Sequence, residues 1–326
     1  MKIQTDITQL LGIRYPIIQG GLQGLGTSHL VSKVSEAGGL GLITAGSFET
    51  KKDMLQDIDI ARRLTDKPFG VNIAIGIRKP MDEFIDGVIE GEVPIVFTSG
   101  NNPEPFIDRL KEKDIKIVHV APSIRFAKKA ESLGYDAVVV NGYEGGGHSG
   151  KDDTTSLTLV QKAANELNIP VIAAGGFSTG KSLLAALALG AEGIQMGTRF
   201  LLSKEAILHN RVKQLLVRMQ ENDTILVKKS IGKTARVWKN ARSIELAKFE
   251  EKGATFEEIF PYISGESYEE LIRNGNVESG VIALGQTVGL IDTIKTVEGI
   301  IQEISNEYDK QLQKLNLLQK GDSLES

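Results

Sequence analysis

The most regular feature of this chain is a series of eight short apolar runs in its first two hundred residues. Each run is rich in aliphatic and β-branched residues, and polar positions do not alternate with apolar ones along it. This pattern is typical of strands that are buried on both faces of a parallel sheet. The runs cover residues 15–20, 40–45, 69–75, 94–98, 115–121, 136–141, 170–175 and 193–197.

Segments with the apolar spacing of helices separate these runs. Several end at a glycine suited to a helix C-terminus, such as Gly38, Gly134 and Gly190. The alternation predicts an α/β protein with a closed (β/α)₈ TIM barrel, and a doubly wound sheet is the rival architecture. The predicted helices cover residues 28–36, 51–64, 105–113, 124–133, 157–167 and 182–189, with a weaker one over 79–90.

The strand signal fades after residue 200. Helical spacing continues over residues 206–220, 255–265, 267–273 and 298–318, and one short strand is predicted over 224–229. We therefore expect a barrel domain built from residues 1–206 plus 281–318. A small, mainly helical insertion, residues 207–280, would cover the barrel mouth, and residues 319–326 would form a frayed tail.

Composition narrows the class of protein. The chain has 326 residues, of which 41% are hydrophobic and 25% charged, as in ordinary globular enzymes. Its 38 basic and 42 acidic residues give a net charge of -4, so neither a nucleic acid nor a membrane is an expected partner. The absence of cysteine excludes disulfides, thiolate catalysis and cysteine-ligated metals. With no signal-peptide pattern at the N-terminus, a cytoplasmic location is expected.

Amides and glycines gather where the predicted strands end, which is where TIM barrels place their active sites. Asn72, Asn141 and Gln195 each stand at such an end. The sixth strand leads into Tyr143-Glu-Gly-Gly-Gly-His-Ser-Gly150, whose His148 is the side chain of this loop that can exchange a proton near neutral pH. This polar, almost uncharged set favours a planar, hydrogen-bonding ligand and no metal.

The last two strand ends are rich in main-chain amides. Ala174-Gly-Gly-Phe-Ser178 and Met196-Gly-Thr198 are each followed by a helical segment, whose N-terminus favours negative charge. These stretches predict a phosphate site that needs no lysine. The alternative is that the glycines only let strands and helices pack closely.

Six motifs resemble the nitronate monooxygenase family, formerly called 2-nitropropane dioxygenases. That superfamily also contains the FMN-dependent enoyl-acyl-carrier-protein reductases. The motifs follow the family's order along nearly the whole chain. They are Tyr15-Pro-Ile-Ile-Gln-Gly-Gly, Ala37-Gly-Gly-Leu-Gly, Lys67-Pro-Phe-Gly-Val-Asn-Ile, Glu144-Gly-Gly-Gly-His-Ser-Gly, Ile169-Pro-Val-Ile-Ala-Ala-Gly-Gly and Gln195-Met-Gly-Thr-Arg-Phe.

The resemblance implies a TIM barrel with non-covalent FMN, and His148 matches the family's active-site histidine. Two departures are visible, because the family usually has glutamine at Asn141 and alanine at Gly145. Many of its monooxygenases also have arginine where Ser149 stands. The implied FMN-binding residues are Asn72, Asn141, Gly146, Gly176, Gln195, Met196, Gly197 and Thr198, with Gly21 and Leu22 near the isoalloxazine.

Two activities follow from the resemblance. As a nitronate monooxygenase, the protein would oxidise a small alkyl nitronate with O₂ to a carbonyl compound and nitrite. As an enoyl reductase, it would use NAD(P)H to reduce an enoyl thioester. The resemblance leaves open whether the chain forms a homodimer.

Two alternatives belong to a different class of function. One is a flavin- or phosphate-binding module without catalysis, and the other is a TIM-barrel isomerase or aldolase. The last would normally need a lysine or carboxylate at a strand end, and the eight predicted ends offer none.

Two possible roles are open for several other residues. His119 lies inside the fifth run and either faces the pocket or is a core histidine. Arg236, like Lys233, either meets an anionic ligand or is solvated surface charge. Asp152 and Asp153 are expected to cap the helix that follows them. Trp238 and His209 lie in the predicted insertion, where Trp238 is expected to serve packing.

Overall fold

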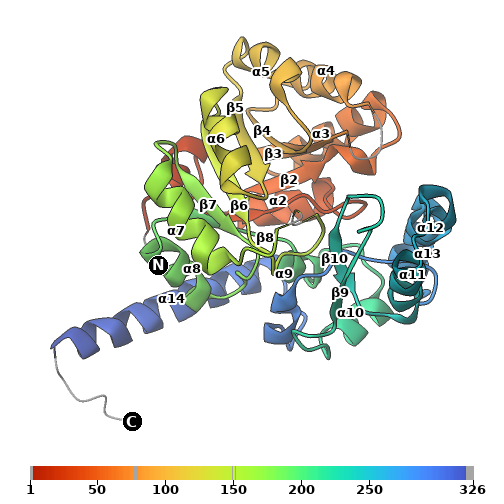
Figure 1. Ribbon diagram of the computed structural model, residues 1–326. Helices are drawn as coiled ribbons and strands as arrows, with labels where there is room; N and C mark the ends of the chain where they lie inside the picture. The colour runs from red at the N-terminus through yellow and green to blue at the C-terminus, as the bar shows by residue number, and fades with distance from the viewer. Residues whose placement is uncertain (1–2, 77–79, 149, 151, 321–326) are drawn as a thin grey trace.

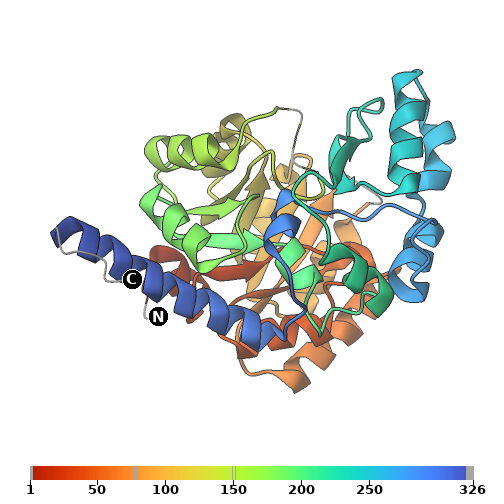
Figure 2. The same cartoon turned by 90° about the horizontal axis from the view of Figure 1, so that it is seen from below.

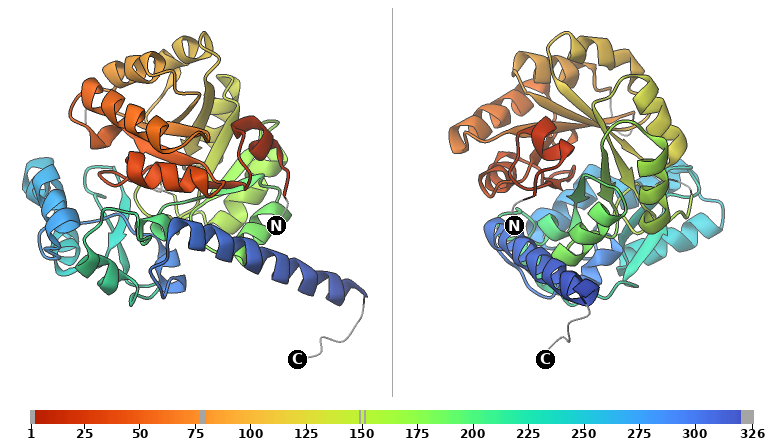
Figure 3. Two further views of the ribbon diagram at one scale, coloured as in Figure 1. Left: turned by 180° about the vertical axis from the view of Figure 1, so that it is seen from behind. Right: turned by 90° about the vertical axis from the view of Figure 1, so that its left-hand side faces the viewer.

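Eight parallel strands form the centre of the molecule, and helices surround them (Figures 1 and 3). The computed structural model describes residues 3–76, 80–148, 150 and 152–320. Neighbouring strands pair in the order β1-β8-β7-β6-β5-β4-β3-β2, and a parallel bridge between Ile18 and Leu40 joins the two ends. The expected TIM barrel is confirmed. Its strands are β1 (Ile17–Gln19), β2 (Gly41–Thr44), β3 (Phe69–Ile75), β4 (Ile95–Gly100), β5 (Lys116–Ala121), β6 (Ala137–Asn141), β7 (Val171–Ala174) and β8 (Gly193–Met196).

Helices α2 to α8 of the barrel fall close to the ranges that their apolar spacing predicts, whereas the short helices α1 and α9 were not predicted. Gly38, Gly134 and Gly190 each follow a helix and adopt positive φ values of 94°, 78° and 89°, which glycine reaches without a Cβ clash. The helices are α1 (Asp6–Leu11), α2 (Ser28–Glu36), α3 (Lys51–Leu64), α4 (Asp82–Glu90), α5 (Glu104–Lys111), α6 (Ile124–Ser132), α7 (Ser156–Glu166), α8 (Gly180–Ala188) and α9 (Thr198–Leu201), with a short 3₁₀ turn η1 (Ala45–Ser47).

Two apolar cores hold the barrel together. The inner core fills the barrel between the strands and includes Ile18, Phe97 and Ala174. Ile7 and Leu11 of α1 join this inner core, so α1 closes the end of the barrel at which the strands begin. The outer core lies between the strands and the surrounding helices. Of the two ends of the barrel, the one where the strands finish is left for a site.

Residues 207–280 gather beside the end of the barrel at which the strands finish (Figures 1 and 2). They contain a β-hairpin as well as helices. The second strand of this hairpin, residues 235–238, was not predicted from the sequence. Only four residues pair there, and so short a run gives no clear pattern. The elements are α10 (Asn210–Leu216), β9 (Thr224–Val227), β10 (Ala235–Trp238), α11 (Ala241–Glu251), α12 (Phe256–Ile263) and α13 (Gly265–Asn274), followed by the 3₁₀ turn η2 (Gln286–Leu290). No helix within the described ranges has the length and apolar character that crossing a membrane requires.

The last helix, α14 (Val297–Lys320), returns to the barrel and packs along α8. Its apolar stripe, which includes Ile300, Ile301 and Ile304, joins the outer core. The far half of α14 extends away from the barrel (Figure 2). Of the predicted frayed tail, residues 321–326 lie outside the described residues, and α14 covers the rest.

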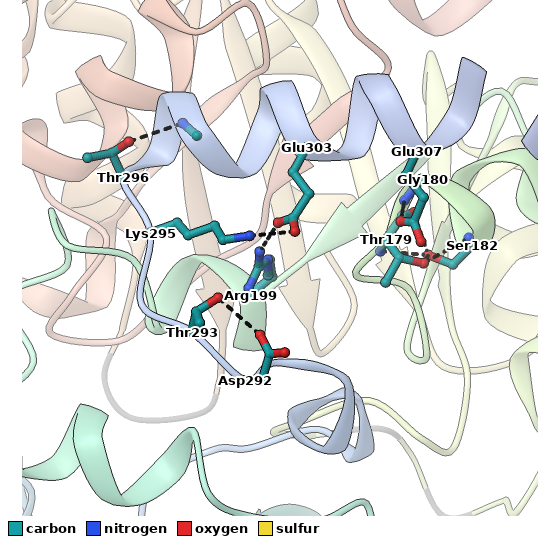
Figure 4. A network of polar contacts seen from close by, with 11 residues as sticks. Thr179, Gly180, Ser182, Arg199, Asp292, Thr293, Lys295, Thr296, Glu303 and Glu307 are labelled. Carbon is teal, nitrogen blue, oxygen red and sulfur yellow. Dashed lines mark hydrogen bonds and ion pairs between the residues drawn. The ribbon is translucent and has the colours of Figure 1, made fainter. Parts of the chain in front are cut away.

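Polar contacts fix the near half of α14 (Figure 4). Glu303 accepts hydrogen bonds from Arg199 at 2.5 Å and from Lys295 at 2.5 Å. Glu307 accepts from the main-chain N–H of Gly180, the first residue of α8, at 2.7 Å. Because Arg199 is 6% exposed, its guanidinium depends on Glu303 for a counter-charge.

The Glu303→Gln variant is expected to unfold about 1–2 kcal/mol more easily than the wild type. The change leaves the buried Arg199 without a negative partner, and solvent around the half-exposed Glu303 limits the cost. Urea unfolding of both proteins measures the difference. Glu298→Gln, on an exposed position of the same helix, is the control and is expected to shift stability by a few tenths of a kcal/mol. Equal losses in the two variants would contradict this account of Glu303.

Candidate functional site

Three carboxamide side chains point into the barrel near its open end. Asn141 and Gln195 are the in-register neighbours of Ala174, which belongs to the inner core. Asn72 is the in-register neighbour of Phe97, another inner-core residue, and its Nδ2 donates to the Phe97 carbonyl at 3.4 Å. Because in-register neighbours of a parallel sheet share a face, the three amides point to the inner side of the barrel. The structure thus brings these predicted residues together.

The β1 end lies directly over one of these amides. A Cβ built on Gly21 would stand 2.3 Å from Oδ1 of Asn72, so the chain approaches Asn72 more closely than any other residue would allow. The next main-chain N–H, that of Leu22, donates to Thr44 Oγ1 at 2.9 Å. Gly21 and Leu22 therefore form one wall of the barrel mouth.

The loop after β7 forms another wall and contains an unsatisfied hydroxyl. Gly175 and Gly176 adopt φ values of 77° and 92°. Among the described residues, Ser178 Oγ and Gln195 Oε1 are buried side-chain oxygens without a hydrogen-bond partner. Buried polar atoms usually have partners, so two orphans at adjacent strand ends suit a polar ligand between them. The sequence patterns included Ser178 in this loop but did not single it out.

The remaining predicted residues of β8 are engaged in other ways. The side chain of Met196 is 1% exposed within the outer core, and its carbonyl accepts from Gly20 N–H at 3.0 Å. Thr198 Oγ1 accepts from Gly285 N–H at 2.9 Å. Met196 can therefore contribute only main-chain atoms to a ligand, whereas the Thr198 hydroxyl still has its proton to donate. Gly197 lies opposite Leu22, whose Cδ2 would be 3.6 Å from an added Cβ.

The glycine-rich loop after β6 is tied to the barrel and to the hairpin. Gly142 N–H donates to the Ala174 carbonyl at 2.9 Å. Gly147 exchanges two main-chain hydrogen bonds with Arg236 of β10, at 2.9 and 2.8 Å. A Cβ on Gly146 would meet the main chain of residues 284–285 at 2.7 Å, so its lack of a side chain serves close packing there. His148 follows directly and is exposed. Residue 149 lies outside the described residues.

The side chain of Arg236 contacts the start of this loop at Tyr143. It is 4% exposed, its Nε donates to the Tyr143 carbonyl at 3.1 Å, and its guanidinium lies 4.7 Å from the centre of the Tyr143 ring. Nη1 donates to Thr224 Oγ1 of β9 at 3.0 Å. The interpretation as solvated surface charge is wrong for Arg236, because the residue is buried, whereas binding of an anion stays a prediction. Arg236 joins the hairpin to the His148 loop.

The helix after the loop is capped by a residue that the sequence patterns did not indicate. Glu144 accepts from the Ser156 N–H at 3.0 and 3.1 Å and from Ser156 Oγ at 2.8 Å. The N-cap residue, Thr155, makes no side-chain capping bond. The expectation that Asp152 or Asp153 caps α7 is therefore wrong. A carboxylate that comes from the loop itself binds the free N–H at this helix end and fixes the loop.

His119 faces away from the barrel mouth. Its in-register neighbour Thr98 lies on the outer side of the sheet, and Thr98 Oγ1 is 2.8 Å from Nδ1 of the imidazole. The ring of Tyr135 meets the imidazole edge-on at 5.5 Å. Burial lowers the pKa of His119 from 6.5 to about 4, so the ring is neutral near pH 7. Of the two alternatives for this residue, the core histidine is correct.

The buried His119 predicts a loss of stability in mild acid. Between pH 6.5 and about 4, the unfolded chain binds a proton at this residue and the folded chain does not, so protonation favours unfolding. Unfolding free energy should therefore fall as pH decreases through this window, by at most about 3 kcal/mol. In His119→Asn, which has no titrating group, this part of the slope should vanish. Urea unfolding at several pH values measures the difference, and parallel slopes for the two proteins would contradict it.

Comparison with known proteins gives relatives along nearly the whole chain. The family model described as nitronate monooxygenase matches residues 4–307. A probable nitronate monooxygenase of Staphylococcus saprophyticus is 32% identical, over 93% of this chain and 98% of that protein. Its counterpart in Staphylococcus aureus strain N315 is 36% identical, over 75% of this chain and 81% of that protein.

Solved structures share the same architecture. FabK from Thermotoga maritima is 38% identical, covers 96% of this chain and 99% of its own, and superposes with a TM-score of 0.89. Nitroalkane oxidase from Streptomyces ansochromogenes is 23% identical, with a TM-score of 0.81 over 95% of this chain and 99% of its own. The second similarity supports the fold alone.

Proposed function

Because this chain belongs to the nitronate monooxygenase family, we propose that it is an FMN-dependent enzyme that oxidises small alkyl nitronates with O₂ to carbonyl compounds and nitrite. The family places it among the oxidoreductases. The family match over residues 4–307 is the observation that carries the proposal. The uncharged, amide-lined barrel mouth beside His148 supports it, because a flavin is planar, offers many hydrogen-bonding atoms along its edge and has a phosphate tail.

The residues at the mouth fit FMN. In our proposal, Asn72, Asn141 and Gln195 hydrogen-bond the flavin's polar edge, which would give the buried Gln195 Oε1 a partner. Gly21 and Leu22 would pack beside the ring. The phosphate would lie against the β7 and β8 loops, where Ser178 Oγ also lacks a partner. The residues assigned to the phosphate are Gly176, Ser178, Gly197 and Thr198, with Gly146 and the main chain of Met196 beside the flavin.

Bound FMN would supply the redox chemistry, accepting electrons from the nitronate and passing them to oxygen. The protein's part is to bind and orient the substrate. We assign His148 to the nitronate oxygens, where an N–H of the imidazole would stabilise their negative charge. With a neutral nitroalkane, Nδ1 or Nε2 would take the proton from the α-carbon. Arg236 and Glu144 fix the two ends of the loop and so position the imidazole.

We further propose that residues 207–280 act as a cap that limits water at the mouth, over a barrel built from residues 1–206 and 281–318. The paired main chains of Gly147 and Arg236 support this role, because they attach the hairpin to the His148 loop. A cytoplasmic location and a small-molecule substrate complete the proposal.

Purified protein tests the proposal directly. It should be yellow and release FMN when denatured, and it should consume O₂ and produce nitrite when propionate 3-nitronate is added without NAD(P)H. A colourless protein that does not bind added FMN would refute the cofactor. A yellow protein that ignores nitronates would refute the substrate but keep the cofactor.

One observation favours a second function, the NAD(P)H-dependent reduction of an enoyl thioester. FabK from Thermotoga maritima is 38% identical to this chain over nearly its full length, and the superfamily contains FMN-dependent enoyl reductases. In that reaction, His148 would donate a hydrogen bond to the thioester carbonyl. Rapid anaerobic bleaching of the flavin by NADH or NADPH would select the reductase over the monooxygenase.

A further inference from the structure

A second cavity lies on the outer side of the barrel, away from the mouth. It measures about 220 Å³ and lies between the loop after β4, strand β5 and helix α6. Its walls are mainly apolar, formed by Pro103, Phe126, Ala130 and Leu133. His119 also lines it, and this residue is 3% exposed. A buried imidazole is thus the main polar feature of an apolar space.

The other polar residues around the cavity are engaged with one another or with the main chain. Asn101 Nδ2 donates to the Gly76 carbonyl at 3.4 Å. Asn102 Nδ2 donates to Glu104 at 3.2 Å, and Lys129 pairs with the same carboxylate at 3.2 Å. Each of these groups already has a partner in the protein. His119 differs from them because it is almost fully buried, so it is the polar group at the inner side of the cavity.

A chain of hydrogen bonds from Tyr135 through Thr98 to His119 determines which nitrogen of the imidazole carries the proton. Tyr135 OH is 2.9 Å from Thr98 Oγ1, which is 2.8 Å from His119 Nδ1. If Tyr135 donates to Thr98 and Thr98 donates to Nδ1, both hydroxyl protons are used. The reverse direction would leave the hydroxyl proton of Tyr135 buried without an acceptor. The first direction is favoured, and it places the ring proton on Nε2.

Nδ1 is engaged with Thr98, so Nε2 is the ring nitrogen left for a ligand in the cavity that His119 lines. The hydrogen bonds of the described residues include none to it. The neutral ring then offers one N–H donor and no charge. Water would be held poorly, because an ordered water needs two to four polar partners and the exposed lining of the cavity is almost entirely apolar. A dry cavity of roughly 150 Å³ holds benzene, so the present cavity has room for a six-membered ring with a substituent.

We propose that this cavity is a second ligand site, which binds a neutral, ring-sized carbonyl compound whose oxygen accepts a hydrogen bond from His119 Nε2. The site is separate from the barrel mouth and does not rest on the proposed catalytic function. Apolar walls take the ring, and a single buried donor selects the oxygen. A cation of the same size is rejected, because it would bring donors against a donor and leave a charge without a partner.

Cyclohexanone and cyclohexylammonium test this assignment on the full-length, flavin-loaded protein. The two molecules have the same ring, but only the ketone has an acceptor. Calorimetry should show saturable binding of cyclohexanone and none of cyclohexylammonium at the same concentration. A crystal soaked with the ketone should place the ring between α6 and the loop after β4, with its oxygen within hydrogen-bond distance of Nε2.

Two variants separate the cavity from other sites. Ala130→Leu fills the space and keeps the imidazole, and His119→Phe keeps a ring but removes the donor. Each should weaken cyclohexanone binding about tenfold or more, as the loss of a buried hydrogen bond or of the space itself predicts. Unchanged affinity in both variants, equal binding of the ammonium compound, or a ketone seated at the barrel mouth would overturn the proposal. Either variant alone decides the matter if the other does not fold.

Discussion

Replacing His148 by alanine is expected to lower kcat/KM by about 10²- to 10⁴-fold, the usual contribution of a positioned general acid or base. The flavin content should stay near that of the wild type. The reason is that most of the residues assigned to FMN, including its three carboxamides, lie outside the His148 loop, and that the change keeps the main chain of Gly146. Steady-state oxygen consumption with a nitronate, together with the flavin-to-protein absorbance ratio, measures both quantities.

The matched control for this change is His29→Ala. His29 is exposed on α2, so its loss should leave turnover within about twofold of the wild type, as for other surface substitutions. A neutral nitroalkane separates the two roles assigned to His148. If the imidazole removes the α-proton, the variant should lose more activity with the nitroalkane than with the preformed nitronate. Full activity of His148→Ala with both substrates would rule out a catalytic role.

The Gly21→Ala variant is expected to lose at least tenfold in FMN affinity. The new Cβ would stand 2.3 Å from Oδ1 and 2.7 Å from Cγ of Asn72, distances at which the Asn72 side chain must leave its position. Asn72 is 6% exposed and has little space to move into. A misplaced amide both loses its bond to the flavin and obstructs the ring, and tenfold corresponds to about 1.4 kcal/mol. Titration of the apoprotein with FMN, followed by flavin fluorescence, measures the affinity.

A second glycine offers a matched control for this prediction. Gly265 is the first residue of α13, and an added Cβ there would meet no atom within 4 Å. Gly265→Ala should therefore keep wild-type FMN affinity and leave stability unchanged or slightly higher. If Gly21→Ala also binds FMN as the wild type does, Asn72 does not contact the flavin. If both variants lose affinity, the effect is not specific to the barrel mouth.

The barrel itself could be predicted from the sequence, because its determinants are local. Each strand is a short apolar run, each helix has its own apolar stripe, and glycines such as Gly38 and Gly190 mark helix ends through a backbone conformation that few other residues adopt. Eight β/α units then favour a closed barrel over the doubly wound sheet that was its rival. The positions of Asn72, Asn141 and Gln195 at the mouth follow from the same reasoning, since every parallel strand ends on the same side.

The roles of Arg236, Glu144 and His119 depended on the tertiary structure. Arg236 meets Tyr143 across 93 positions of sequence, and no local pattern indicates that a hairpin in the insertion returns to the β6 loop. Glu144 caps a helix that begins twelve residues further along the chain. The sequence offers caps closer to that helix, so it did not indicate Glu144. His119 could point to either face of its strand, because a fully buried strand has no polar alternation to fix the direction.

The sequence by itself therefore determined the barrel, its order of strands and helices, and the amide-rich set of residues at its open end, because these depend on periodicity and on backbone conformations that neighbouring residues impose. Only the tertiary structure decided which charged side chains hold the His148 loop and on which side of the sheet His119 lies. Those outcomes depend on contacts between segments distant in the chain, where burial and hydrogen-bond satisfaction select one partner among many.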